Sequence, residues 1–356
     1  MDFRESFRTL CEQSFEFFVG ALCWTYNPKD YPESPNLPFI PWDYQLSGQE
    51  TIDASIGVDD VLIEKSRDMG ATWIILAEFL WRWWKMPGQS FLLGSRKEEL
   101  VEKKGDTRTL FWKLDYMLER IPKFFLPNFE RTERHLQNLE NGSVIDGEAT
   151  NDDFGRGDRR TAILLDEFAA VRNGHSVLSA TRDTTKTRIF LATPKGAAGA
   201  YYDQRKKMVA EKPKQIVRWH WSVHPHKSLG LYIGEDGKYR SPWYDNECSR
   251  AATPQEIAQE LDIDYAASAW QFFDGTQLDL IEAKAREPLW TGEILFEEDG
   301  TDPKLSRQQW GRVSLWCPLS AAGIPPEDEY AVTCDIATGT AGECSSQSAA
   351  SIVSLT

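Results

Sequence analysis

The chain has 356 residues, with 40 Lys and Arg against 55 Asp and Glu, and a net charge of −15. Hydrophobic residues make up 41% and charged residues 27%, which is ordinary globular usage and excludes a disordered chain, a collagen and a disulfide-stapled miniprotein. At roughly 150 residues per domain, this length allows two domains. The acidic balance by itself argues against a nucleic-acid partner, because nucleic-acid binders usually carry a basic excess.

The charge is unevenly distributed along the chain. Residues 1–60 are net −8 and residues 251–356 are net −13, whereas residues 61–250 are net +6. The most basic stretch, residues 181–220, has 10 basic and 3 acidic residues. This stretch is a candidate DNA contact, with an ordinary solvated surface as the alternative.

The cysteines and the apolar runs indicate in which cellular compartment the protein is expected. The six cysteines form no C-x-x-C pair, so no zinc or redox motif is predicted, and their spread is typical of reduced thiols in a cytosol. The N-terminus does not resemble a signal peptide. The longest apolar stretch, residues 73–84, is short and contains Glu78 and Arg82, so it cannot cross a bilayer. We therefore expect an intracellular protein without a membrane span.

The predicted elements alternate between helices and buried strands. Helices are expected over residues 3–24, 42–55, 72–85 and 96–119, with an extended loop at 25–43. Strands are expected over residues 61–65, 89–95, 161–167, 188–194 and 216–224, with a hairpin around an Asn-Gly turn at 135–149. This alternation predicts an α/β fold in which a mainly parallel sheet is flanked by helices.

The chain changes character near residue 269, where it becomes acidic and rich in Gly and Pro. Residues 330–356 resemble two strands joined by a turn of small residues. Because the sequence stops within the second strand, and an unpaired strand edge is a liability, we expect the chain to be cut inside a second domain. The expected divisions are an N-terminal segment 1–40, a main domain 41–268, a linker subdomain 269–328 and an incomplete domain 329–356.

The first chemical motif is EKSRDMGAT, residues 64–72, between a strand and a helix. In this context the backbone N–H groups at the helix N-terminus can bind phosphate. The standard loop is G-x-x-x-x-G-K-[ST], and this chain has Glu64 at the first Gly position and Ala71 at the Lys position. Lys65 and Arg67 are candidates to supply the missing charge. A strand–turn–helix without a ligand is the alternative.

Three more motifs complete the pattern. Asp166 and Glu167 follow an apolar strand; Asp166 with Thr72 would hold Mg²⁺, and Glu167 would orient or deprotonate the attacking water. Thr193, in LATP, would sense the γ-phosphate. Gln45 would read the adenine edge, because an amide offers both a donor and an acceptor. Each feature alone also fits an ordinary structural role: an acidic turn, a proline turn or an exposed helix glutamine.

Taken in order, these motifs resemble the ATPase domain of the large terminase subunit of tailed bacteriophages, the motor that packages DNA. The resemblance covers roughly residues 40–356, and loops with the lysine moved to the start, as Lys65 is here, occur in that family. It rests on SRDMGAT, the Asp-Glu pair, LATP, NGS at 141–143, Arg-Gly at 156–157 and EIAQELDIDYAAS at 256–268. It implies an ASCE-type P-loop NTPase fold with ATP and Mg²⁺ as cofactors. The residues matched to the nucleotide site are Gln45, Lys65, Ser66, Arg67, Gly70, Ala71, Thr72 and Thr193.

The family resemblance also implies residues beyond the phosphate loop. An arginine finger is expected, and we favour Arg67 in cis and Arg156 in trans, with Arg159 as a further candidate. Members of the family carry a C-terminal RNase H-like nuclease that uses divalent Mg²⁺ or Mn²⁺, and Asp335 matches its first metal-binding carboxylate. The other carboxylates would lie beyond Thr356, so we expect no nuclease activity in this chain.

The implied function is translocation of double-stranded DNA into a procapsid, driven by ATP hydrolysis. The implied partners are DNA, a portal protein and a small terminase subunit, with a ring of subunits when assembled. The implied location is the cytoplasm of the bacterial host, docked on the procapsid and not in the mature virion. Alternatives are a non-catalytic nucleotide-gated module that docks to a portal, an inactive structural fragment and a helicase-like ATPase. The helicase requires arginine-rich motifs in a second RecA-like domain, which the sequence does not contain.

Overall fold

The computed structural model divides into two compact units, Met1–Gln271 and Phe272–Thr356, and each is described by itself. The residues that it describes are 2–29, 31–267, 284, 286–296, 301, 303–309, 311–320, 323–324, 326–327, 330–335 and 349–354. Among them, no helix has the length and apolar character that crossing a membrane requires.

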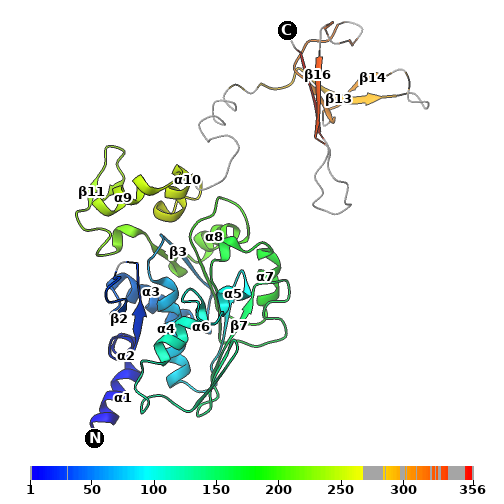
Figure 1. Ribbon diagram of the computed structural model, residues 1–356. Helices are drawn as coiled ribbons and strands as arrows, with labels where there is room; N and C mark the ends of the chain where they lie inside the picture. Colours follow the sequence, from blue (N-terminus) through cyan, green and yellow to red (C-terminus); the bar gives the residue numbers. More distant parts are fainter. Residues whose placement is uncertain are drawn as a thin grey trace. The chain divides into compact units, whose positions relative to one another are not determined.

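The first unit is built on an eight-stranded sheet with the strand order β10-β3-β9-β8-β4-β7-β6-β5 (Figure 1). Its strands are β3 (Val61–Lys65), β4 (Ser90–Ser95), β5 (Phe129–Thr132), β6 (His135–Asn138), β7 (Val144–Ala149), β8 (Ala162–Leu165), β9 (Arg188–Ala192) and β10 (Ile216–Trp219). The strands from β10 to β7 pair in parallel, and β6 and β5 add antiparallel pairs at one side. The predicted mainly parallel α/β sheet is confirmed.

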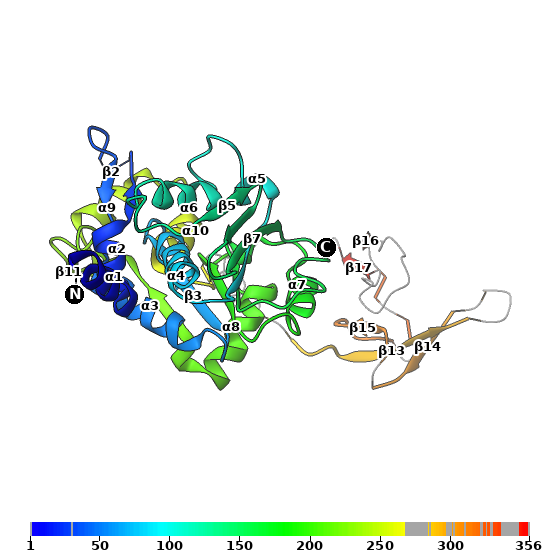
Figure 2. The ribbon, with the colours of Figure 1, turned by 90° about the horizontal axis from the view of Figure 1, so that it is seen from below.

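The central strands bury both of their faces, as parallel strands between two helical layers do. Ile63 and Leu164 point into one core, and their neighbours Leu62 and Ile163 point into another. The first core is shared with α1 (Phe3–Gln13), α2 (Phe15–Leu22), α3 (Asp43–Ser55), α4 (Ala71–Lys85) and α6 (Leu110–Leu118). The second is shared with η1 (Phe168–Ala170), α7 (Gly174–Thr181) and α8 (Ala200–Glu211). Figure 2 shows the two helical groups on opposite sides of the sheet.

Helix α4 is the centre of the larger core. It is apolar on nearly every side and buried along most of its length, as the sequence predicts for a helix without a polar face. The N-terminal helices pack against its far end, where Phe15 contacts Trp81 and Phe18 contacts Trp84 at ring-centroid distances of 5.7 and 5.3 Å. The indole N–H of Trp81 donates to the carbonyl of Cys11 at 2.7 Å. The N-terminal helices therefore belong to the first unit.

Three predicted elements differ in detail. The helix predicted over 3–24 is two helices that end at Leu22, because Ser14 ends α1 and caps α2, and Trp24 belongs to β1. The single helix predicted over 96–119 is wrong: α5 (Glu98–Val101) ends early, Gly105 takes a left-handed turn, and Thr109 caps α6. The strand predicted over 216–224 stops at Trp219, where the chain turns into the 3₁₀ helix η3 (Trp221–Val223). The hairpin predicted over 135–149 is confirmed as β6 and β7. Inside the predicted loop 25–43, β1 (Trp24–Tyr26) pairs with β2 (Asn36–Pro38).

The last part of the first unit forms a small layer of its own. It contains β11 (Tyr232–Ile233), β12 (Tyr239–Arg240), α9 (Pro242–Arg250), α10 (Pro254–Ile257) and the π-helical turn η4 (Ala258–Asp262). Trp221, Tyr244 and Leu261 form its core. This layer contacts the end of β3, as described below.

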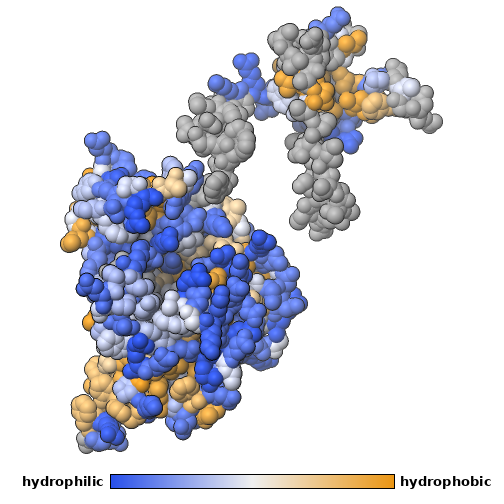
Figure 3. All heavy atoms as spheres, viewed as in Figure 1, coloured by the Kyte–Doolittle hydropathy of each residue, from blue (hydrophilic) through white to orange (hydrophobic). Residues whose placement is uncertain are grey.

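Exposed apolar side chains gather at the N-terminal end of the first unit. Figure 3 shows this hydrophobic patch in the region of α1 and α2 in Figure 1. The exposed apolar residues in these N-terminal segments include Phe3, Leu10 and Ile40. Helices α1 and α2 lie at the end of the unit away from α10 (Figure 1).

The second unit contains two small antiparallel sheets. The first has β13 (Trp290–Leu295) between β14 (Lys304–Arg307) and β15 (Val313–Leu315). The second pairs β16 (Tyr330–Asp335) with β17 (Ala349–Ser354), so the two strands expected in 330–356 are present. Asp335 ends β16 opposite Ala349, and its side chain lies outside the described part of the structure. The domain limits at 40, 268 and 328, and the RNase H-like character of the last part, stay predictions.

Candidate functional site

The predicted site residues come from neighbouring strands of the sheet. Lys65 is the last residue of β3, Thr193 follows β9 directly, and Asp166 follows β8 directly. Arg96 follows β4, which is the next strand of the sheet. These strands are parallel, so their carboxyl ends meet at one edge, which is where α/β sheets bind ligands. The topology therefore brings the motifs together although they are widely separated in the sequence.

The loop between β3 and α4 contains two residues in the left-handed region and leads directly into α4. Gly70 caps α4 in the left-handed region at φ +73°, and a side chain there would meet Gln45, because an added Cβ would lie 2.5 Å from its amide nitrogen. Asp68 is also left-handed, at φ +56°. Ala71 is buried as the first residue of α4, and the partly buried Thr72 follows it. The first turn of α4, whose N–H groups lack partners within the helix, thus begins at the loop.

Gln45 has a different role from the predicted one. Its side chain is only 4% exposed. Its amide oxygen accepts from the N–H of Trp42 at 3.0 Å, and its amide nitrogen donates to the carbonyl of Met69 at 3.0 Å. The amide is buried with both of its ends bonded inside the protein, so the adenine contact predicted from sequence is not supported. Gln45 stabilises the phosphate loop instead.

Ser66 likewise uses its polar groups inside the protein. Its hydroxyl donates to the carbonyl of Leu261 at 2.5 Å and accepts from the N–H of Trp221 at 2.9 Å. Its own N–H donates to the carbonyl of Trp219 at 2.9 Å. A direct phosphate contact by this hydroxyl is therefore not supported, and Ser66 joins the start of the loop to η3 and η4.

Glu64 stands where the standard loop has its first glycine, and the structure explains it. Its carboxylate is buried and bonds Arg205 at 2.5 Å, Arg218 at 2.9 Å and the hydroxyl of Tyr265 at 2.9 Å. Burial raises the pKa of this carboxyl, but the two guanidinium groups and the phenol outweigh burial and leave the pKa below its usual value. Glu64 therefore fixes the end of β3 to α8, to β10 and to the chain after η4.

Asp166 lies among both cations and a like charge. Burial and the neighbouring Glu167 raise its pKa to about 6, and Lys65 and Lys113 oppose that rise. Sequence reasoning missed Lys113, which belongs to α6 and whose ammonium donates to the carbonyl of Arg108 at 2.5 Å. No local motif marks Lys113, and it lay inside the wrongly predicted helix. The structure thus places two lysines close enough to Asp166 to affect its charge.

Glu167 is exposed, unlike the neighbouring Asp166. Its backbone is left-handed at φ +52°, and its side chain is 55% exposed. One carboxylate oxygen lies 3.0 Å from Nε of Arg96, which sequence reasoning also missed. An exposed pair of this kind is worth little in free energy, so this carboxylate can exchange partners.

The donor set fits a magnesium ion. Mg²⁺ takes oxygen ligands, commonly one or two protein groups together with phosphate oxygens and waters. Asp166 and Thr72 supply a carboxylate and a hydroxyl of this kind, and the raised pKa of Asp166 reflects a buried carboxylate that a cation would stabilise. In the described ranges, no three His, Cys, Asp or Glu side chains gather into a possible metal site.

The arginine candidates lie on exposed segments. Arg67 donates its N–H to the carbonyl of Glu260 at 2.7 Å, and its side chain is exposed. Arg156 is exposed, with Nε 3.5 Å from Asp153, and Arg159 is exposed beside it. Arg160, the last arginine of GRGDRR, is instead 10% exposed and paired with acidic side chains. Arg67, Arg156 and Arg159 stay candidates for the finger.

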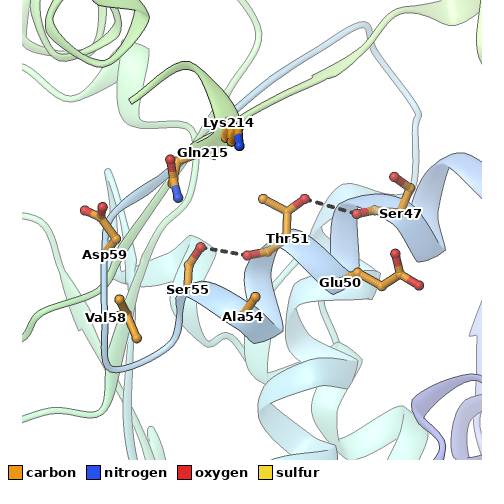
Figure 4. Close-up of a pocket in the computed structure, with 9 residues that line it drawn as sticks. All are labelled: Ser47, Glu50, Thr51, Ala54, Ser55, Val58, Asp59, Lys214 and Gln215. Carbon is orange, nitrogen blue, oxygen red and sulfur yellow. Dashed lines mark hydrogen bonds between the residues drawn. The ribbon is translucent and has the colours of Figure 1, made fainter. Parts of the chain in front are cut away.

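The pocket in Figure 4 is separate from this site. It has a volume of about 360 Å³ and lies between α3 and η2 (Pro213–Gln215), with Val58 and Asp59 just before β3. Two hydroxyls that line it, those of Thr51 and Ser55, bond carbonyls of α3 at 3.1 and 2.7 Å. It therefore lies at the amino end of β3, whereas the motifs lie at the carboxyl end.

Known proteins resemble this chain in sequence and in fold. The model of the N-terminal part of the T4-like-virus type of terminase large subunit matches residues 62–285. No curated protein matches the sequence. The structure of the HK97 bacteriophage large terminase is 14% identical, with a TM-score of 0.52, and the match covers 80% of this chain and 62% of that one. This likeness shows the fold, and the chain spans about 62% of the length of the HK97 protein.

Two other solved structures are similar at a lower level. The Thermus phage P74-26 large terminase ATPase domain is 17% identical, with a TM-score of 0.44, covering 64% of this chain and 94% of that one. The large terminase of a second thermophilic bacteriophage, in complex with ADP, is 11% identical, with a TM-score of 0.46, covering 71% and 60%. The family model spans more than half of the sequence, and the motifs and fold agree with it. The chain therefore belongs to the family of terminase large subunits, whose N-terminal part it matches.

Proposed function

We propose that this chain is the ATP-hydrolysing motor part of a DNA-packaging terminase and couples hydrolysis to the movement of double-stranded DNA into a procapsid. The observation that carries the proposal is the meeting of two motifs at one sheet edge. The loop 66–70 leads into α4, and the pair Asp166 and Glu167 ends β8. Phosphoryl transfer to water requires this combination of a phosphate-binding backbone, a metal-binding carboxylate and a group that acts on water.

Each residue of the edge has a part in the proposed reaction. The loop N–H groups and Lys65 bind the phosphates, and Thr72 and Asp166 hold Mg²⁺. When bound, Mg²⁺ neutralises negative charge on the phosphate oxygens. Glu167 orients the attacking water and accepts its proton, for which it must leave Arg96. Thr193, at the end of the strand between them, senses the γ-phosphate.

The remaining charges in the reaction are assigned to arginines. Arg67, exposed on the loop, acts in cis on the developing charge. Arg156, exposed on the loop before β8, acts in trans on the site of a neighbouring subunit when the chains assemble into a ring.

The proposed DNA contact is the basic stretch 181–220. Exposed cations of this stretch include Arg182, Lys195 and Lys207. Contacts of these cations with DNA phosphates release counterions, so binding should weaken steeply as salt rises. The portal protein, the small terminase subunit and transient docking in the host cytoplasm complete the proposal.

A second function has one specific observation in its favour. Ala71 stands at the position where the standard loop has its phosphate-binding lysine, and Glu167 is paired with Arg96 in this structure. A nucleotide-gated module that docks to a portal would bind ATP through the same loop without hydrolysing it. Turnover therefore separates the two functions.

The test measures ATP binding and phosphate release for the full chain and for Lys65→Ala and Glu167→Ala. The proposal predicts that Lys65→Ala loses binding, whereas Glu167→Ala binds ATP but loses turnover. Lys123→Ala, a change of an exposed lysine after α6, should match the wild type. Unchanged hydrolysis in Glu167→Ala contradicts the mechanism, and binding without turnover in the wild type supports the docking module.

A further inference from the structure

A lysine from outside the phosphate loop holds two of the loop carbonyls. The ammonium of Lys227 donates to the carbonyl of Arg67 at 2.5 Å and to the carbonyl of Asp68 at 2.9 Å. Lys227 is about 160 residues away in the sequence and is only 7% exposed. Hydrogen bonds from an ammonium are stronger than bonds between neutral groups.

The next carbonyl of the loop is held in the same way from another element. The carbonyl of Met69 accepts from the hydroxyl of Tyr44 at 2.9 Å and from the amide of Gln45 at 3.0 Å. Three consecutive carbonyls, those of residues 67–69, are therefore bonded to side chains from outside the loop.

These bonds decide where the loop N–H groups point. In a trans peptide the C=O and the N–H point in opposite directions, and the described chain has no cis peptide bond. The carbonyl of Arg67 shares its peptide with the N–H of Asp68, and that of Asp68 shares its peptide with the N–H of Met69. Holding both carbonyls toward Lys227 turns both N–H groups to the opposite side of the loop. Neither N–H has a backbone partner within the described residues.

Lys227 is itself fixed by its surroundings. Its ammonium lies 4.7 Å from the ring centroid of Trp243, on α9. Its backbone carbonyl accepts from the hydroxyl of Ser241 at 2.6 Å, and Ser241 caps the same helix. The cation is therefore held where little water screens it, so its charge acts strongly on the adjacent peptides.

We propose that Lys227 is a positioning residue for the phosphates of ATP and acts through the loop. It orders the N–H groups of Asp68 and Met69 for phosphate binding, polarises their peptides, and places a positive charge behind a loop that has Ala71 where a lysine is usual. The inference rests on the proposed function, and it adds a second source of positive charge to Lys65. Sequence reasoning gives no sign of it, because no loop motif includes Lys227.

The test compares Lys227→Met, Lys227→Arg and the control Lys123→Met, a change of an exposed lysine after α6, in the full chain. Binding of a fluorescent ATP analogue is measured, with tripolyphosphate and adenosine as competitors, and melting temperature is recorded. Lys227→Met should weaken ATP and tripolyphosphate binding about tenfold or more, the loss expected for a charge-assisted hydrogen bond. Adenosine binding should be unchanged. Lys227→Arg, which can donate to both carbonyls, should restore most of the affinity, and Lys123→Met should match the wild type.

The outcomes separate this inference from the proposed function. A wild-type chain that binds no ATP contradicts the proposed function. A wild type that binds ATP, with Lys227→Met equally tight, contradicts the role of Lys227. Equal losses of adenosine and tripolyphosphate affinity also contradict it, because they indicate general damage to the fold. If Lys227→Met melts far below the wild type, Lys227→Arg decides: a well-folded Arg variant with wild-type phosphate affinity supports the role, and one with weak phosphate affinity contradicts it.

Discussion

The loop after β3 and the turn after β8 lie at the same sheet edge but are stabilised very differently. The carbonyls of the loop accept hydrogen bonds from Lys227, Tyr44 and Gln45. Lys227 and Gln45 are buried, and Tyr44 is half-buried. The turn ends in Glu167, which is 55% exposed and has one ion pair, with Arg96. The loop is thus held by several hydrogen bonds in the absence of nucleotide, whereas Glu167, the proposed base, has an exposed partner that it can exchange.

The largest expected effect comes from the exposed half. Glu167→Gln removes the group that accepts a proton from water, so ATP turnover should fall about 10²-fold or more, the usual range for a general base. Nucleotide affinity should stay near that of the wild type, because the loop is untouched. Phosphate release and analogue binding measure the two quantities. Glu211→Gln, an exposed change at the end of α8, is the matched control. A turnover drop of less than threefold would remove Glu167 from the mechanism.

Ser66→Ala tests the ordered half. It leaves a buried carbonyl at Leu261 and a buried N–H at Trp221 without their partner, so the free energy of unfolding should fall by about 1–3 kcal/mol. Affinity for ATP should fall with it, because the loop loses its bond to η4. Denaturant titration measures the first effect. Ser47→Ala, exposed on α3, should change stability by less than about 0.5 kcal/mol. Equal stability of the two variants would show that the loop does not depend on this bond.

We expect the stability of the protein to depend on pH through Glu78, a buried residue of α4. Glu78 of α4 is fully buried beside Gln49 and Arg82, and burial, with the nearby Asp53 carboxylate, raises its pKa to about 7. A raised pKa means that the folded state favours the protonated acid, so its contribution to stability is full below about pH 4.5 and is lost as the pH rises through 7.

Glu78→Gln should remove this dependence. As the pH rises from 4.5 to 7, the free energy of unfolding of the variant should increase relative to that of the wild type, by on the order of 1–3 kcal/mol. Unfolding curves at a series of pH values measure the difference. A constant difference between the two proteins across that range would show that Glu78 does not titrate there.

The smallest expected effect comes from Arg96→Ala. The pair with Glu167 is exposed, and pairs of this kind are worth about 0.2–1 kcal/mol, so stability should change little and turnover should rise by at most about fivefold as the carboxylate is released. Phosphate release under saturating ATP checks this. Arg8→Ala, which breaks a comparably exposed pair with Glu12, should leave turnover at the wild-type value. A large loss of turnover in Arg96→Ala would instead place Arg96 in the reaction.

The same contrast explains what the sequence could predict. Apolar runs mark β3, β8 and β9 because parallel strands are buried on both faces, and the polar residues that end those strands mark the edge. Lys65 and Asp166 follow from that pattern, and Thr72 follows from the glycine loop that leads into α4. Gln45 was singled out by its position in the sequence, but its buried bonds to Trp42 and Met69 could not be predicted, because a buried amide takes whichever partners the fold provides. Lys227 and Lys113 have no local signature and act only through tertiary contacts.

The central claim is that Lys65 supplies the positive charge that the standard loop has in a lysine at the position of Ala71. The loop itself is held by hydrogen bonds from Lys227 to its carbonyls. A crystal structure of the chain with a non-hydrolysable ATP analogue and Mg²⁺ tests it most directly. The account predicts Nζ of Lys65 at about 3 Å from a β- or γ-phosphate oxygen, with the N–H groups of Asp68 and Met69 facing the phosphates. A nucleotide bound away from this loop, or phosphates held with Lys65 turned away, would contradict it.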